Sequence, residues 1–501
     1  MIGNANLYAH FQQHFPADLE TQLLITEDGR GVTYAEADEA SSRMANSLLQ
    51  LGAKPGDRVT VQVEKSAENL FLYLGCLRAG LVYHPLNTAY KASELAYFLG
   101  DAEPTIVICA SDALSTIESV LPPKGVKAVL TLDADGSGSL MKQAAAANTE
   151  ADVAHCKGTD MAALLYSSGT TGQPKGIMLS HDNLRTNTES LVEIWGFSTS
   201  DRLLHALPIY HVHGLFTAVG CVMMSGASMV WHSSFNDRAA IAALPECTTM
   251  MGVPTFYTRL LANPDFGPQC CANMRLFISG SAPLLAETFV EFQQRSGHTI
   301  LERYGMTETG MNTSNPLQGE RRAGTVGLPL PGVKVRVVDE AGEAVAGGET
   351  GNLQVKGPNV FPGYWHMPGK TAEDFTADGF FNTGDKACIA ADGYVSIVGR
   401  AKDMIITGGL NVYPKEIELV IDDMPGIKES AVIGIPHADF GEAVIAVIVP
   451  DGSAPRAEDI IAHCKAQLAN FKIPKRVEVI DALPRNAMGK VQKNLLREQY
   501  S

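Results

Sequence analysis

The chain has 501 residues, and its 39 Lys and Arg against 55 Asp and Glu give a formal net charge of −16. At roughly 150 residues per domain, this length predicts about two to four domains. The acidic balance excludes a protein that wraps nucleic acid, because such a protein needs a basic surface. It does not exclude a small anionic ligand, since a local site can oppose the global charge.

The composition also argues against a membrane protein. Hydrophobic residues make up 45% of the chain and charged residues 19%, which is typical of a soluble globular protein. No apolar run approaches about 18 residues, and the start lacks the pattern of a secretory signal. The nine cysteines have no regular spacing, and Cys270 and Cys271 are adjacent, which suits neither a zinc site nor a disulfide framework. We therefore expect a cytoplasmic protein that partners neither a membrane nor nucleic acid.

The N-terminal part alternates helix and strand signals. Thr33 and Glu36 fit a capping box, and apolar residues then recur at spacings of three and four until Gly52, a typical helix stop. Residues 59–63 alternate as in a strand, and residues 67–77 predict a further helix. This alternation predicts an α/β fold with mostly parallel sheets.

The pattern of predicted helices and strands changes near residue 400. Residues 393–400 predict a strand that closes one unit, and the remainder predicts a small α+β domain. Its elements are strands at 431–435, 443–449 and 476–480 and a helix at 457–468. We predict a large domain of layered sheets and helices over 1–399, a hinge at 400–403 and a small mobile domain over 404–501. The alternative for 400–403 is an ordinary surface loop.

The segment 166–176 carries the most informative local pattern. Two leucines before it indicate a strand that runs into a loop with three glycines, four hydroxyl side chains after Tyr166, and Lys175. Glycines allow a tight turn whose N–H groups approach a ligand, and the lysine adds positive charge. Such a loop can cradle a polyphosphate, although a polar surface loop explains the composition equally well.

Further motifs follow in a fixed order. They are Tyr304-Gly305-Met306-Thr307-Glu308, Thr383-Gly384-Asp385, residues 399–403 and residues 484–490. Together with the loop, this series resembles the adenylate-forming superfamily, which includes acyl-CoA synthetases, firefly luciferase and peptide-synthetase adenylation domains. The resemblance covers essentially the whole chain. It implies that an acid is activated with ATP before transfer to a thiol.

The resemblance assigns the nucleotide site. Glu308 matches the residue that holds Mg²⁺, for which a hard oxygen ligand is suitable, and Thr307 stands beside it as a catalytic residue. Asp385 and Arg400 match the ribose contacts. The implied ATP-binding set is Ser167, Ser168, Gly169, Thr170, Thr171, Gly172, Lys175, Ser281, Ala282, Tyr304, Gly305, Thr307, Asp385, Arg400 and Lys490.

The resemblance also implies a small domain that moves between two half-reactions. Lys490 matches the catalytic lysine, a compact charge on a flexible stem, and Lys402 matches the hinge pivot. Gly408 and Gly409 would line the tunnel for CoA. Because relatives are often acetylated on the catalytic lysine, a lysine acetyltransferase and deacetylase acting on Lys490 are implied partners.

The identity of the acid substrate is the feature that the sequence determines least. Arg259 lies in a segment that lines the acyl pocket in the superfamily, and burying a charge against an alkyl chain is costly, whereas a second carboxylate could pair with it. Residues 252–259, 276–283 and 302–309 resemble malonyl-CoA synthetases, in which the positions of Arg259 and Ser281 bind the distal carboxylate. His211, His213 and Met306 complete the predicted acid site.

The sequence therefore predicts an enzyme that joins malonate and CoA, with ATP converted to AMP and pyrophosphate, and that tolerates methylmalonate. Two alternatives stay open. One is a short-chain or aryl acyl-CoA synthetase in which Arg259 faces outward. The other is a nucleotide-binding scaffold without catalysis, which the joint presence of Glu308, Asp385, Lys402 and Lys490 opposes.

Overall fold

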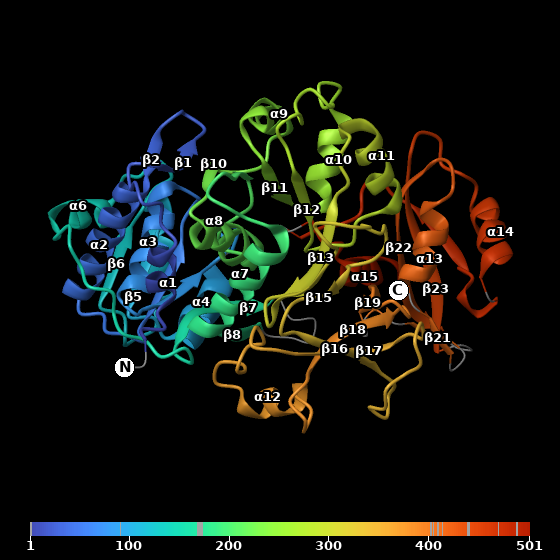
Figure 1. Cartoon of the computed structure of the whole chain (residues 1–501). Coiled ribbons are helices and arrows are strands. Elements are labelled where there is room, and N and C mark those ends of the chain that lie inside the picture. Colours follow the sequence, from blue (N-terminus) through green and yellow to red (C-terminus); the bar gives the residue numbers. More distant parts are fainter. Residues whose placement is uncertain are drawn as a thin grey trace.

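The structure is a computed structural model that describes residues 3–90, 92–167, 174–400, 403, 405–407, 410–412, 414–437, 441–468, 470–486 and 489–501. Figure 1 shows the chain running from helix-covered sheets at one end to a smaller sheet formed by the C-terminal residues at the other. The arrangement confirms the predicted α/β class.

A six-stranded sheet holds the phosphate-loop segment. Its order is β6-β5-β3-β4-β7-β8, and all neighbours are parallel except the β7–β8 pair. The strands are β3 (Arg58–Gln62), β4 (Val82–Pro85), β5 (Ile106–Cys109), β6 (Ala128–Thr131), β7 (Met161–Ser167) and β8 (Lys175–Ser180). Helix α2 (Tyr34–Gln50) precedes β3, and the helices between the strands are α3 (Ala67–Arg78), α4 (Ala92–Ala102), α5 (Leu114–Ser119) and α6 (Ser139–Ala146).

A nine-stranded sheet lies beside it in the order β15-β14-β13-β12-β11-β9-β10-β1-β2. The strands are β1 (Gln22–Thr26), β2 (Gly31–Thr33), β9 (Arg202–His205), β10 (Ser228–Trp231), β11 (Thr249–Gly252), β12 (Leu276–Ser279), β13 (Leu301–Met306), β14 (Gly310–Ser314) and β15 (Leu328–Pro329). The helices are α1 (Leu7–Gln13), α7 (His181–Trp195), α8 (Gly220–Ser225), α9 (Asp237–Ala243), α10 (Pro254–Ala262) and α11 (Ala286–Ser296). Strands β9 to β13 are parallel, so the loops that follow them gather at one edge.

Two smaller sheets complete the chain. An antiparallel sheet contains β16 (Lys334–Val338), β17 (Gly351–Lys356), β18 (Phe381–Ile389) and β19 (Val395–Arg400), with α12 (Pro368–Asp374) beside it. The last sheet contains β20 (Ile405–Thr407), β21 (Leu410–Val412), β22 (Ile427–His437), β23 (Gly441–Pro450) and β24 (Arg476–Val479), with helices α13 (Pro414–Asp422), α14 (Ala457–Gln467) and α15 (Lys493–Tyr500). Its two core clusters contain only residues from 405 onward.

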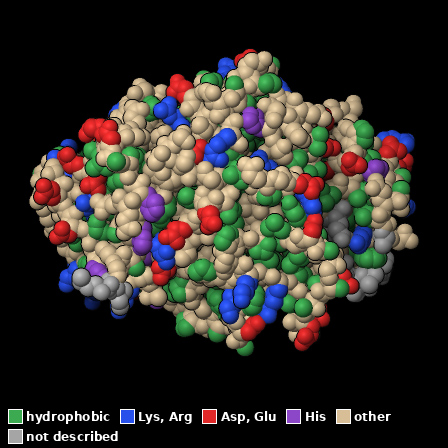
Figure 2. All heavy atoms as spheres, viewed as in Figure 1, with side chains coloured by type: hydrophobic (Ala, Val, Ile, Leu, Met, Phe, Trp, Pro, Cys, Tyr) green, Lys and Arg blue, Asp and Glu red, His purple; other side chains and the backbone are tan. Residues whose placement is uncertain are grey.

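Local signals in the sequence correspond to elements. Thr33 caps α2 with both halves of the capping box formed, and Gly52 follows the helix with φ +88°. The predicted strands and helix of the C-terminal part appear as β22, β23, β24 and α14. Among the described residues, no helix is both long and apolar enough to cross a bilayer. Figure 2 shows acidic and basic side chains scattered over the face in view, so the charge of −16 is not gathered in one acidic patch there.

Candidate active site

The turn between β13 and β14 brings Thr307 and Glu308 to the edge of the nine-stranded sheet. A Cβ on Gly305 would overlap the carbonyl oxygen of Gly310, so only glycine fits this tight hairpin. Thr309 N–H donates to the Met306 carbonyl at 3.2 Å and closes the turn. Glu308 is buried, whereas Met306 and Thr307 are half-buried.

Tyr304 and Asp385 meet from different sheets. The Tyr304 hydroxyl donates to Asp385 Oδ2 at 2.5 Å, and the Asp385 N–H donates to Thr383 Oγ1 at 3.1 Å. Gly384 has φ +71°, which turns β18 at this point. Arg400 pairs with Asp385 in the β18–β19 ladder. The predicted ribose contacts are therefore neighbours along the backbone, and the Arg400 side chain lies outside the described residues.

Lys175 and Glu308 share Tyr364 as a neighbour. The Lys175 Nζ lies 4.2 Å from the centroid of the Tyr364 ring and 3.7 Å from Asp374 Oδ2. Burial raises the pKa of Tyr364, and the charges of Glu308 and then Asp374 raise it further. The lysine after the phosphate loop and the predicted Mg²⁺ ligand are thus brought together. Ser167 ends β7, while Ser168, Gly169, Thr170, Thr171 and Gly172 lie outside the described residues.

The donor set around Glu308 is compatible with Mg²⁺. Among the described residues there is no group of three His, Cys, Asp or Glu side chains that could hold an ion. A metal at Glu308 would therefore take its remaining ligands from phosphate oxygens, hydroxyl groups and water. Mg²⁺ is usually bound in that way, through one or two carboxylates together with substrate phosphates.

The loop after β12 and the segment after β9 face each other on the acid side. Ser281 adopts φ +69°, an uncommon conformation for a residue with a side chain. Its hydroxyl lies 3.3 Å from Nδ1 of His213, and the His213 N–H donates to Nδ1 of His211 at 3.3 Å. His213 is buried and begins a π-helical turn that extends to Val219. Ser281, His211 and His213 therefore form one cluster, with Ala282 half-buried in the same loop.

Arg303 lies beneath this cluster and has no predicted role. It is 3% exposed, and its Nε and Nη2 atoms have no hydrogen-bond partner among the described residues. A Cβ on Gly280 would overlap its guanidinium, so the glycine makes room for the arginine. Burial lowers the pKa of Arg303 to about 10, which still leaves it charged at neutral pH. The site thus contains a buried cation without an anionic hydrogen-bond partner.

The two histidines are neutral at physiological pH. Burial, followed by the charge of Arg303, lowers the pKa of His211 to about 4 and that of His213 well below its usual range. They can therefore offer hydrogen bonds but no charge. The buried Nε2 of His213 has no hydrogen-bond partner among the described residues, so the hydrogen-bonding capacity of one imidazole nitrogen is unused there.

This depressed pKa predicts a pH-dependent stability. Between pH 6.5 and about 4 the unfolded chain binds a proton at His211 that the folded chain does not, so stability falls as the pH falls. Replacing His211 with Asn should remove about 1–2 kcal/mol of the loss between pH 7.5 and 5.0. Thermal unfolding at both pH values measures this, with His155→Asn, at an exposed position, as control. Equal losses in all three proteins would contradict it.

Arg259 lies on α10 and is exposed. It is four residues after Thr255 and so shares a helix face with it. The expectation of a buried charge at Arg259 was wrong, and the cost of burying it therefore does not exclude an alkyl acid. The sequence correctly placed Arg259 on a helix, but the amphipathic pattern of that helix did not determine whether Arg259 faces the solvent or the interior.

The loop that carries Lys490 packs against this face. A Cβ on Gly489, whose φ is +75°, would lie 3.3 Å from the Thr255 hydroxyl. Within the loop, the Lys490 N–H donates to Asn486 Oδ1 at 2.9 Å and the Asn486 N–H donates to the Lys490 carbonyl at 2.9 Å. The half-buried Lys490 therefore stands next to the helix of Arg259. Lys402, Gly408 and Gly409 lie outside the described residues.

Sequence reasoning missed Arg303 although it stands between predicted residues. The signal was a pair of charged residues, Glu302 and Arg303, inside a strand that follows the apolar Ile300 and Leu301. Charged residues are almost never fully buried unless they are paired. Glu302 is also buried, which raises its pKa to about 8. Such a pair on a buried strand indicates a site rather than a surface.

Comparison with known proteins agrees with this geometry. Residues 11–365 match the AMP-binding enzyme family, and residues 416–490 match the C-terminal domain of AMP-binding enzymes. The chain is 32% identical to a malonate–CoA ligase of Arabidopsis thaliana over 95% of its length and 86% of the relative. It is 33% identical to a feruloyl-CoA synthase of an Amycolatopsis species over 95% of both chains. Overall identity to these two relatives therefore does not distinguish their acids.

A solved structure gives a further comparison. The ATP-bound MatB from Rhodopseudomonas palustris is 51% identical, covers 99% of both chains and superposes with a TM-score of 0.97. The apo form of that protein, at the same identity and coverage, gives 0.88. The arrangement of this chain is therefore closer to that of the ATP-bound relative than to that of the apo form.

Proposed function

The chain belongs to the AMP-binding enzyme family, and we propose that it is a malonate–CoA ligase that works through malonyl-AMP. In the first half-reaction a carboxylate oxygen of malonate attacks the α-phosphorus of ATP, and the bond to pyrophosphate breaks. In the second, the sulfur of CoA attacks the acyl carbon, AMP leaves with the electrons of the C–O bond, and the thiol proton is released.

The nucleotide part of the proposal rests on the two clusters described above. Asp385, oriented by Tyr304, would accept hydrogen bonds from the ribose, with Arg400 beside it. Lys175 would face the phosphates together with the loop 167–172. Mg²⁺, held by Glu308, would neutralise phosphate charge when bound. Lys490 would stabilise the charge that develops as the carboxylate attacks phosphorus.

The choice of a diacid is supported by one observation. The buried guanidinium of Arg303 lies beneath Ser281 and His213, and its Nε and Nη2 atoms have no hydrogen-bond partner among the residues that the structure describes. An isolated buried charge is costly, and a carboxylate with good hydrogen bonds offsets that cost. A monoacid with an alkyl tail would leave the guanidinium unpaired. Ser281 and neutral His213 would donate further hydrogen bonds. The relative named as a malonate–CoA ligase supports the same acid. An added methyl group changes binding by only about 1–3 kcal/mol, so methylmalonate would be tolerated.

The second half-reaction requires Lys490 to leave. We propose that residues 404–501 turn about the segment 400–403, with Lys402 as pivot, so that Gly408 and Gly409 line the path of the CoA thiol. Acetylation of Lys490 would remove its charge and block the first half-reaction, and it stays a prediction.

The reaction class is tested by measuring pyrophosphate with malonate and ATP, first without and then with CoA. A ligase of this kind should release about one equivalent without CoA and turn over continuously with it, producing AMP. Pyrophosphate release that does not depend on malonate, or formation of ADP instead of AMP, would contradict the proposal. ATP binding without any pyrophosphate would favour the scaffold alternative.

Arg259 supplies a narrower prediction. On the face of α10 that meets the Lys490 loop, its guanidinium would reach a carboxylate that extends from the site. Arg259→Ala should raise the KM for malonate at least about tenfold, the typical effect of a lost charged contact, and leave the KM for ATP nearly unchanged. Arg238→Ala, at an exposed arginine on α9, is the control. An equal rise for ATP and malonate would place Arg259 outside the acid site.

A further inference from the structure

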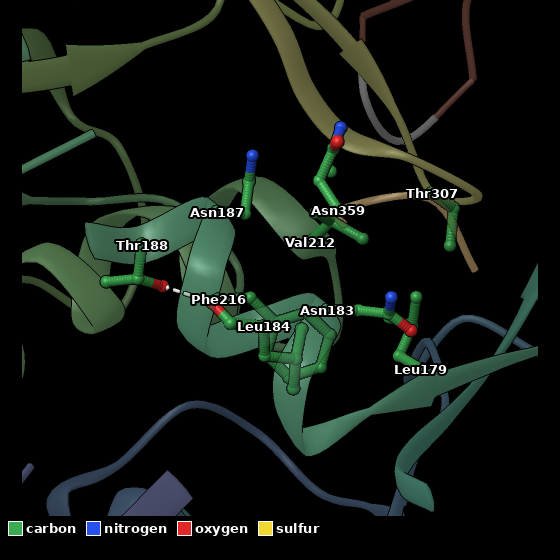
Figure 3. A pocket seen from close by; sticks show the side chains of 10 residues that line it. Leu179, Asn183, Leu184, Asn187, Thr188, Val212, Phe216, Thr307 and Asn359 are labelled. Atoms are coloured by element: carbon green, nitrogen blue, oxygen red, sulfur yellow. Dashed lines mark hydrogen bonds between the residues drawn. The ribbon is translucent and has the colours of Figure 1, made fainter. Parts of the chain in front are cut away.

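Two asparagines hold the turn of Thr307 and Glu308 from behind. Asn187 comes from α7 and Asn359 from the loop after β17, and both are buried. Figure 3 shows both side chains at the same small cavity as Thr307. Neither asparagine belongs to the predicted ATP or acid site. Both contact the β13–β14 hairpin, which carries Thr307 and Glu308.

Asn187 pairs with the hairpin as a neighbouring strand would. Its Oδ1 accepts from the Met311 N–H at 2.9 Å, and its Nδ2 donates to the Met311 carbonyl at 2.8 Å. The fit is close, because a Cβ on Gly310 would lie 2.5 Å from Asn187 Oδ1. One amide therefore fixes both backbone groups of Met311, the second residue of β14.

Asn359 holds the other side of the same segment. Its Nδ2 donates to the Thr309 carbonyl at 2.7 Å and lies 3.2 Å from the Met311 carbonyl. Two residues later, the Phe361 N–H donates to the Glu308 carbonyl at 2.8 Å. The backbone from Glu308 to Met311 is thus attached on two sides to elements that lie far away in the sequence.

A small cavity lies between the two asparagines and Thr307, so the turn that carries Thr307 and Glu308 has space to move. The cavity is about 10 Å³ in volume, which is room for about one water molecule. Its wall combines polar side chains, among them Asn187, Thr307 and Asn359, with apolar ones such as Leu184 and Phe216. Close packing does not fill the space behind Thr307, so the asparagine hydrogen bonds fix the turn where packing does not.

We propose that Asn187 is a positioning residue that sets the place of Glu308, and thereby the affinity for Mg²⁺ with ATP. This inference rests on the proposed function, because it needs Glu308 to be the metal ligand. Groups that orient a metal ligand without touching the metal typically change metal affinity about 10–100-fold when they are replaced. Asn359 acts in the same way from the opposite side.

The test uses Asn187→Asp, which keeps the acceptor for Met311 N–H and loses the donor to its carbonyl. Asn6→Asp is the matched control. Asn6 is also buried, donates through Nδ2 to the Leu77 and Ala154 carbonyls at 2.7 and 3.0 Å, accepts from Tyr8 N–H, and lies outside the site. Both substitutions therefore remove the same kind of donor and retain the same kind of acceptor.

Two readouts are measured in the full chain. The first is the rise in thermal midpoint given by ATP with MgCl₂ over ATP with EDTA, and the second is the Mg²⁺ concentration for half-maximal pyrophosphate release. Asn187→Asp should lose most of the Mg²⁺-dependent rise and need at least tenfold more Mg²⁺, whereas Asn6→Asp should match the unmodified chain. Asn359→Asp should behave like Asn187→Asp and provides the test if Asn187→Asp does not fold.

Opposite results are distinguishable. If the asparagine variants that fold keep the Mg²⁺ requirement of the unmodified chain, the positioning role is wrong and the proposed function stands. If Asn6→Asp shifts the requirement as much as Asn187→Asp, the effect is general destabilisation and the inference is wrong. If the unmodified chain shows no Mg²⁺-dependent rise and no pyrophosphate, the proposed function fails, and the inference fails with it.

Discussion

Replacing Lys490 with Ala is expected to slow formation of the acyl-adenylate by about 10²–10³-fold, the usual effect of removing one group that stabilises developing charge. The loop of Lys490 packs against the start of α10 at Thr255, next to the acid side of the site. In this arrangement the ammonium group can act on the attacking carboxylate and the α-phosphate. Thioester formation from preformed malonyl-AMP should be largely retained, because Lys490 would have left the site by then.

The two half-reactions are measured separately, as pyrophosphate release without CoA and as thioester formation from synthetic malonyl-AMP. Lys493→Ala is the control, since Lys493 follows Lys490 by three residues and pairs with Glu418 at 2.6 Å. It should leave both rates within about twofold. Equal losses in both half-reactions for Lys490→Ala would contradict a lysine that serves only the first and a small domain that moves between them.

Replacing Arg303 with Met should separate stability from activity. Methionine has a similar length and no charge, and replacing a buried charge by a packed apolar side chain is often neutral or stabilising. The thermal midpoint should therefore stay or rise. The kcat/KM for malonate should fall by roughly 10²–10⁴-fold, because removing one partner of a buried ion pair costs about 3–5 kcal/mol.

The Arg303→Met substitution should also shift the substrate preference from malonate toward butyrate. Butyrate lacks the second carboxylate and would no longer leave a buried guanidinium unpaired, so its kcat/KM should rise in Arg303→Met. Arg295→Met is a useful comparison, since Arg295 on α11 donates to the Phe266 carbonyl at 3.0 Å and is away from the cluster. A loss of stability together with equal losses for malonate and butyrate would show that Arg303 supports the fold and does not select the acid.

The nucleotide side of the site could be predicted from the sequence because its residues lie in short motifs. Tyr304 and Asp385 were assigned to one nucleotide site, and they are hydrogen-bonded. Fold class followed from the alternation of helix and strand signals. These features depend on local pattern, or on turns that favour glycine, by a close backbone approach at Gly305 and by a positive φ at Gly384.

The acid side could not be predicted as well, because it depends on what surrounds each charge. Arg259 and Arg303 are both arginines near predicted motifs, yet Arg259 is exposed, whereas Arg303 is buried and its Nε and Nη2 atoms have no hydrogen-bond partner in the part of the chain that the structure describes. The contact of Asn187 with Met311 joins residues 124 positions apart. No local pattern encodes such a contact, since it follows from how α7 packs on the β13–β14 hairpin.

If the chain joins CoA to a diacid, its rates with different acids should show this preference. Thioester formation is measured with ATP, Mg²⁺ and CoA for malonate, methylmalonate, succinate, acetate and butyrate. Malonate should show the highest kcat/KM, with methylmalonate within about 200-fold, since one methyl group is worth about 1–3 kcal/mol. Acetate and butyrate should be lower by about 10²-fold or more, because each leaves Arg303 unpaired. A higher kcat/KM for acetate or butyrate than for malonate would contradict it.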